Sequence, residues 1–131
     1  MDWKLICAVL TCAATPLIAQ EPSDGRATYV RFCSSCHGPE ARGNGPMGPS
    51  LTLMPKDLTQ LAAENGGVFP TFDVIAKIDG SDPLMSHGSP MPVYGDFFTG
   101  KGVAMKVESG QLVMTSQPIV DLVGYLQGIQ E

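Results

Sequence analysis

Apolar residues recur at helical spacing near both ends of the predicted domain. The clearest stripe consists of Ile119, Leu122, Val123, Leu126 and Ile129. Intervals of three and four residues place these side chains on one helix face, which we expect to pack into the core. Ser116 stands at the N-cap of this closing helix, and Pro118 lies near its first position. An opening helix is expected from Ser23 or Asp24, either a good N-cap, to about Phe32.

Two shorter helices are predicted in the middle of the chain. Asp57 is expected to cap a helix over residues 58–64, which stops at a run of Asn-Gly-Gly. Thr71 is expected to cap a helix over residues 72–78. The side chains of this second helix that we expect to face the core are Phe72, Ile75, Ala76 and Ile78.

Long segments between these helices are rich in glycine and proline. Residues 38–55 and 81–98 are interrupted too often by these two residue types to form regular structure, so we predict loops. Residues 103–107 and 111–115 alternate loosely between apolar and polar side chains around a Ser-Gly turn, which predicts a small β-hairpin at about 103–115. The expected fold class is mainly α, with several short helices and long loops.

Size and composition limit what such a chain can do. Its 131 residues allow one domain, and 44% hydrophobic with 16% charged residues indicates a globular protein. Because 15 glycines and 11 prolines leave little regular structure for a large core, a buried prosthetic group is expected to fill the centre. The formal charge of −5 and the lack of a basic tract argue against nucleic acid as a partner.

The first residues form a predicted signal peptide. Lys4 precedes an apolar run over residues 5–14, and Ala19 is a suitable residue for cleavage before Gln20. The run is too short for a stable membrane span, which takes about 20 apolar residues. We therefore predict a signal peptide at 1–19, a domain at 20–131 and export to the periplasm. An uncleaved anchor and lipidation of Cys12 remain alternatives.

Cys33, Cys36 and His37 form the pattern of c-type haem attachment, two cysteines two residues apart and an adjacent histidine. Each thiol adds to one haem vinyl group, and the histidine binds the iron as a neutral imidazole. A zinc half-site, a thioredoxin-like redox pair and a plain disulfide are the rival interpretations. The motif predicts one covalently bound haem c with its iron.

The chain resembles class I c-type cytochromes, from about residue 23 to residue 130. The first likeness is the attachment motif near the N-terminus of the mature chain. The second is the sequence Gly-Pro-x-Leu that ends at Leu51. In the family, the carbonyl of the proline equivalent to Pro49 accepts a hydrogen bond from the axial histidine, and the leucine packs on the haem. The resemblance thus implies that Pro49 orients the ring of His37.

Two further likenesses lie in other parts of the chain. Met91 stands between two prolines and is followed by Tyr-Gly-Asp, as in the family's axial-methionine loop. Gly25 and Tyr29 in the opening helix, with Tyr125 in the closing helix, resemble the close helix crossing of the family. The resemblance implies the cytochrome c fold wrapped round one haem. The hairpin is additional to the minimal fold, and it either shields the haem or offers a docking surface.

Met91 is the predicted sixth iron ligand, since a thioether suits iron and raises the potential of cytochrome haem. The prolines on both sides stiffen its loop. Met85 is a reserve ligand, His87 would give a bis-histidine haem, and an open sixth position is the remaining alternative. Arg42 either pairs with a haem propionate or is a solvated loop residue.

Closed coordination by His37 and Met91 leaves the iron able only to gain or lose one electron. The predicted function is therefore electron transfer between redox partner proteins, as a soluble carrier or as the cytochrome subunit of a redox enzyme. No acid–base pair or activated nucleophile stands out in the sequence, so we do not expect an enzyme. The alternatives are a haem enzyme or gas sensor with an open sixth site, and a disulfide module without haem.

Overall fold

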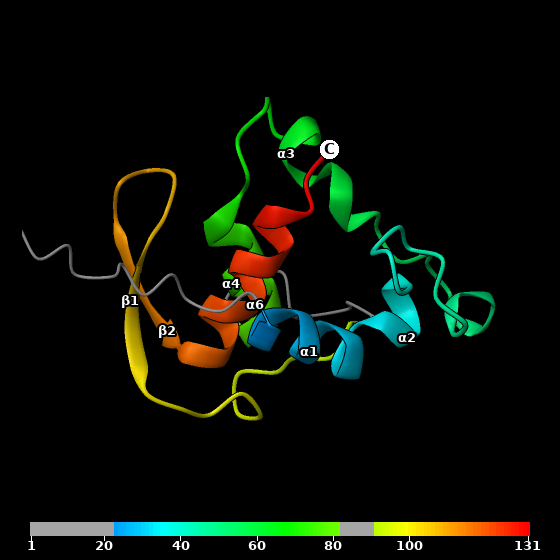
Figure 1. Cartoon of the computed structure of the whole chain (residues 1–131), viewed down its shortest axis with the longest axis horizontal. Helices are drawn as coiled ribbons and strands as arrows, with labels where there is room; N and C mark the ends of the chain where they lie inside the picture. Colours follow the sequence, from blue (N-terminus) through cyan, green and yellow to red (C-terminus); the bar gives the residue numbers. More distant parts are fainter. Residues whose placement is uncertain (1–22, 82–90) are drawn as a thin grey trace, which may run out of the picture.

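The computed structural model describes residues 23–81 and 91–131 (Figure 1). Helices α1 (Ser23–Phe32), α2 (Ser34–His37), α3 (Leu61–Glu64), α4 (Thr71–Asp79) and α6 (Gln117–Gly128) alternate with loops. Two 3₁₀ turns, η1 (Gly48–Ser50) and η2 (Leu58–Gln60), lie between α2 and α3. Strands β1 (Gly102–Lys106) and β2 (Leu112–Ser116) form an antiparallel pair. The mainly α prediction with a small hairpin is confirmed. The predicted signal peptide at 1–19, Met85 and His87 lie outside the described residues.

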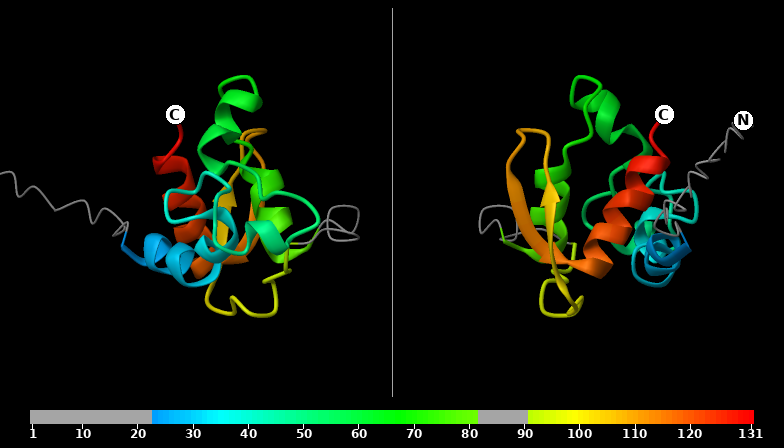
Figure 2. Two further views of the ribbon diagram at one scale, coloured as in Figure 1. Left: turned by 90° about the vertical axis from the view of Figure 1, so that its right-hand side faces the viewer. Right: turned by 60° about the vertical axis from the view of Figure 1, so that its left-hand side comes forward.

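Helices α1 and α6 cross closely, as the views in Figure 2 show. A methyl group at Gly25 would lie 2.0 Å from the main-chain oxygen of Asp121, so only glycine fits at this crossing. One turn further on, the rings of Tyr29 and Tyr125 lie 5.3 Å apart between their centroids. The sequence prediction of a glycine-permitted, aromatic-filled crossing is confirmed.

The core lies between α1, α4 and α6. The apolar stripe of α6 is buried as predicted, with Ile119, Leu122, Val123 and Leu126 all at most 4% exposed. Helix α4 contributes Ile75, Ala76 and Ile78, but Phe72 is 46% exposed. The prediction that Phe72 faces the core is wrong: its side chain lies at the surface, whereas the neighbouring Thr71 in the same turn of α4 is 5% exposed.

The start of α4 differs from the sequence prediction. Thr71 is the first residue of the helix rather than its cap, and its hydroxyl points back to the Phe69 carbonyl at 3.4 Å. The amide of Phe72 instead donates to the Glu108 carboxylate at 3.2 Å. A residue in the hairpin turn therefore satisfies an amide that a local side chain was expected to cap. At η2 the prediction is confirmed, because Asp57 accepts from the amide of Thr59.

The hairpin has one covered and one exposed face. Met105 and Val113, which are register partners, pack against the core, and Val107, the residue after β1, is 5% exposed. On the outer face Leu112 and Met114 are 69% and 67% exposed. No helix in the described part of the chain is long and apolar enough to cross a membrane.

Candidate functional site

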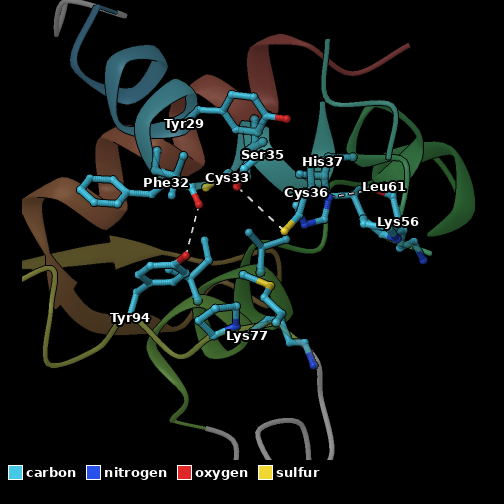
Figure 3. Close-up of a pocket in the computed structure, with 18 of the residues that line it drawn as sticks. Tyr29, Phe32, Cys33, Ser35, Cys36, His37, Lys56, Leu61, Lys77 and Tyr94 are labelled. Atoms are coloured by element: carbon cyan, nitrogen blue, oxygen red, sulfur yellow. Dashed lines mark hydrogen bonds between the residues drawn. The ribbon is translucent and has the colours of Figure 1, made fainter. Parts of the chain in front are cut away.

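A cavity of about 560 Å³ opens beside α2 and is lined mainly by apolar side chains (Figure 3). The site residues predicted from the sequence that line it are Cys33, Cys36, His37, Leu51 and Met91. Helices α4 and α6 supply further apolar lining from Ile78, Leu122 and Leu126. The structure therefore brings into one cavity residues that are far apart in the sequence. Pro49 is not among the lining residues.

Helix α2 is held by the loop that follows it. The amides of Gly43, Gly45 and Met47 donate to the carbonyls of His37, Cys36 and Ser35 at 2.8–3.0 Å. These carbonyls belong to a helix end that leaves such groups without helical partners. A methyl group at Gly45 would lie 2.5 Å from the main chain of Cys36, so glycine is needed for this approach. The loop thus fixes the orientation of the Cys-x-x-Cys-His turn.

The ring of His37 has one nitrogen engaged by the protein. Its Nδ1 lies 3.0 Å from the main-chain oxygen of Lys56, and because a carbonyl only accepts, Nδ1 carries the proton (Figure 3). This leaves Nε2 as the nitrogen with a free lone pair. Burial lowers the pKa of His37, against a smaller opposing effect of the bond to Lys56. The fold therefore favours a neutral imidazole, the form that binds a metal.

The predicted role of Pro49 is wrong, because the acceptor for His37 is the carbonyl of Lys56. Pro49 is exposed within η1, whose bonds close locally, from Ser50 to Met47 and from Leu51 to Gly48. The chain returns to the ring of His37 at Lys56, next to Pro55. Gly43 permits this approach, since a methyl group there would lie 2.2 Å from the Pro55 oxygen. The sequence signal that could have pointed to this segment was Asp57, the predicted cap residue next to Lys56.

Arg42 lies outside the cavity lining. Its guanidinium forms an ion pair with Glu131, with the two side chains 44% and 52% exposed. The prediction of a propionate partner at this position is therefore not supported by its location. The cations that do line the cavity are Lys56, whose ammonium pairs with Glu64, and Lys77.

In the part of the chain that the structure describes, the surroundings of the two cysteines differ from those of a typical redox-active pair or zinc site. Burial, with a smaller contribution from Cys36, raises the pKa of the Cys33 thiol to about 11, whereas redox-active pairs depress a thiol pKa. Within residues 23–81 and 91–131, no three His, Cys, Asp or Glu side chains gather as metal ligands would. Both thiols face the cavity, where haem attachment requires them.

Met91 lines the cavity from the segment after α4 and is partly buried against the core. An aromatic cluster of Phe32, Tyr94, Phe97 and Phe98 supports this segment, with ring centroids 5.0–6.3 Å apart. The Tyr94 hydroxyl donates to the Phe32 carbonyl at 3.2 Å, and the Tyr94 amide donates to the Ile78 carbonyl at 2.7 Å. Sequence reasoning missed this cluster, although Tyr94, Phe97 and Phe98 follow Met91 closely in the sequence.

Together the fold and the cavity describe a small protein built around one apolar prosthetic group. A family model described as Cytochrome c matches residues 22–130, so the chain belongs to the cytochrome c family. No curated protein and no solved structure gives a significant match to the chain. Membership of this family implies one covalently bound haem c with iron and a function in electron transfer.

The residues present fit this group. The cavity volume lies within the usual range of about 300–1,000 Å³ for ligand and cofactor sites. Cys33 and Cys36 are at its wall, where they could be attached, and burial lowers the pKa of His37, which favours the neutral ring with Nε2 available. Among the described residues, the charged side chains that line the remainder are Lys56, Asp73 and Lys77, and this small number suits a macrocycle with an apolar body.

Proposed function

We propose that this protein carries single electrons between redox partners, with His37 and Met91 as the residues that would bind its haem iron. The observation that carries this proposal is that both side chains line one cavity with the attachment cysteines. When bound, the haem supplies an iron that exchanges one electron. A methionine opposite a histidine favours a high reduction potential.

The protein's own residues support this role by positioning and by excluding water. The Lys56 carbonyl keeps the proton of His37 on Nδ1 and so leaves Nε2 directed to a ligand. Apolar side chains of Leu51, Ile78 and Leu122 cover the cavity, which disfavours additional charge in it. The aromatic cluster holds the segment that carries Met91. Little of this structure has to move when one electron enters or leaves.

The test is an optical spectrum of the purified protein, oxidised and reduced, with carbon monoxide added to the reduced form. We expect a ferric band characteristic of methionine sulfur on iron and no response to carbon monoxide. A prompt shift with carbon monoxide would show an available sixth site and would favour the alternative of a haem enzyme or gas sensor.

We further propose that residues 1–19 direct export to the periplasm and that residues 20–131 form the mature domain. The partners are redox proteins, and the chain acts as a free carrier or as a subunit of a redox complex. The formal charge of −5 suits a basic docking surface, which would mainly raise the encounter rate. Mass spectrometry of the periplasmic protein should give a chain that begins at Gln20 and carries one haem. Recovery of the full-length chain in the membrane fraction would contradict export as a cleaved protein.

A further inference from the structure

The peptide group that faces His37 lies at the edge of a rigid turn. Its oxygen belongs to Lys56 and its nitrogen to Asp57, so whatever holds Asp57 also orients this oxygen. The Asp57 carboxylate accepts from the amide and the hydroxyl of Thr59 at 2.9 and 2.7 Å. Thr59 is only 3% exposed, so the residue that Asp57 binds is anchored in the packed interior.

A second side chain holds the same segment from the other end of the protein. Gln130, just after α6, donates from Nε2 to the Leu58 carbonyl at 2.8 Å. Its Oε1 accepts from the Ala62 amide at 2.9 Å. The same Nε2 also donates to the Leu126 carbonyl at 2.7 Å, which anchors the amide to α6. One amide therefore connects the C-terminal helix to two main-chain groups of residues 58–62.

We propose that Asp57 and Gln130 are positioning residues for His37. They hold the Lys56 carbonyl against Nδ1 and thereby set how strongly the ring nitrogen on the other side donates to a metal. A firm hydrogen bond at Nδ1 raises the basicity of the ligand. A more basic ligand favours ferric over ferrous iron, so loosening this bond should raise the reduction potential. This inference rests on the ligation of His37 in the proposed function.

Two substitutions of Asp57 separate position from charge. Both Asp57→Asn and Asp57→Ala remove a negative charge, which by itself raises the potential in each variant. Asn keeps a side-chain oxygen that can accept from Thr59, whereas Ala removes the acceptor. We expect a higher potential for Asp57→Ala than for Asp57→Asn. We also expect several-fold faster exchange of the His37 ring N–H, measured by NMR, in the Ala variant alone. Equal potentials and equal exchange rates would overturn the role of Asp57.

A second pair of variants, which changes no charge, tests the role of Gln130. It also tests whether this segment positions His37 if Asp57→Ala does not fold. Gln130→Leu removes both contacts to residues 58–62. Gln127→Leu is the matched control, because Gln127 lies on α6 and donates to the Thr71 hydroxyl at 3.3 Å instead. Only Gln130→Leu should raise the potential and speed exchange of the ring proton. The same result in both variants would mean general loosening of α6 and would overturn the proposal.

A measurement on the wild-type protein distinguishes this proposal from the proposed ligation of iron by His37. If His37 binds the iron, its ring protons show hyperfine shifts in the ferric NMR spectrum. Absence of these shifts would overturn both the ligand assignment and the positioning role. Their presence, with matching values for each variant and its control, would overturn only the positioning role.

Discussion

Two segments that meet at the cavity are built in different ways. The histidine segment, residues 33–62, is held by main-chain hydrogen bonds, such as those from Gly43 to His37 and from Leu58 to Ala41. The methionine segment, residues 91–98, is held mainly by aromatic side chains that pack on Phe32. Main-chain hydrogen bonds depend on how closely two backbone segments can approach each other. Aromatic packing depends instead on which side chains are present.

Because of this difference, the two segments should be sensitive to different kinds of substitution. The histidine segment should tolerate many side-chain changes but few changes of glycine, since its carbonyls and amides approach closely. The methionine segment should tolerate surface changes but not loss of a buried ring. Attachment through Cys33 and Cys36, as the sequence motif predicts, would tie the histidine segment but not the methionine segment to the haem. Damage to the methionine segment should therefore leave the haem in the protein.

The largest expected effect is on the methionine segment. Phe98 is 5% exposed and its ring stacks on Tyr94 at 5.1 Å between centroids. Phe98→Ala should lower the free energy of unfolding by about 3–5 kcal/mol, the usual effect of truncating a buried ring. Denaturant unfolding of the haem-loaded protein measures this. The matched control is Phe97→Ala, since Phe97 is 60% exposed and its loss should cost about 1 kcal/mol or less. Equal losses would contradict the proposed dependence on buried rings.

The corresponding change in the histidine segment is Gly43→Ala. Gly43 has a φ of +77°, and an added methyl group would lie 2.2 Å from the Pro55 oxygen. We expect the free energy of unfolding to fall by about 2–3 kcal/mol from backbone strain and this contact. Gly66→Ala is the control, because its φ is +68° but nothing lies within 4 Å of the added carbon. That control should lose only about 1 kcal/mol. A Gly43 variant as stable as the control would disprove the close approach.

Substitution of Met91 separates coordination from stability. Met91→Ala should leave the haem attached, open the iron to carbon monoxide and lower the reduction potential by on the order of 0.1 V. Spectroelectrochemistry and carbon monoxide titration measure both changes. Met114→Ala, at an exposed position on the outer face of the hairpin, should behave as wild type. If Met91→Ala keeps wild-type coordination, another residue is the sixth ligand.

The smallest effect is expected from Tyr94→Phe. It removes the hydrogen bond to the Phe32 carbonyl and should lower the free energy of unfolding by about 1 kcal/mol. Burial raises the pKa of Tyr94 above its usual value of 10.0. A tyrosine whose pKa is higher in the folded than in the unfolded chain contributes stability at a pH below its unfolded-state pKa. This contribution is lost as the pH rises through the folded-state pKa. The stability of Tyr94→Phe should therefore fall less steeply than that of wild type above about pH 10. An unchanged slope in stability against pH would contradict this.

Local patterns predicted much of the fold correctly. The apolar stripe of α6, the Asp57 cap and the hairpin each depend on residues close together in the sequence, which is why periodicity and capping rules identify them. The helix crossing at Gly25 was also predicted, through the family resemblance. The prediction that Thr71 caps α4 was wrong, because Glu108, a residue of the distant hairpin turn, binds an amide at the start of this helix.

The chain itself indicated the chemistry of the site, because Cys33, Cys36 and His37 offer two thiols and an imidazole in the attachment pattern, and Met91 offers a thioether between two prolines. Only the tertiary structure decided which carbonyl orients His37. Every residue carries a carbonyl, so side-chain identity could not distinguish Pro49 from Lys56. The choice depends on the close approach at Gly43 and on the distant contacts of Gln130. The same physical reason applies to Arg42, whose partner Glu131 is near in space and far in sequence.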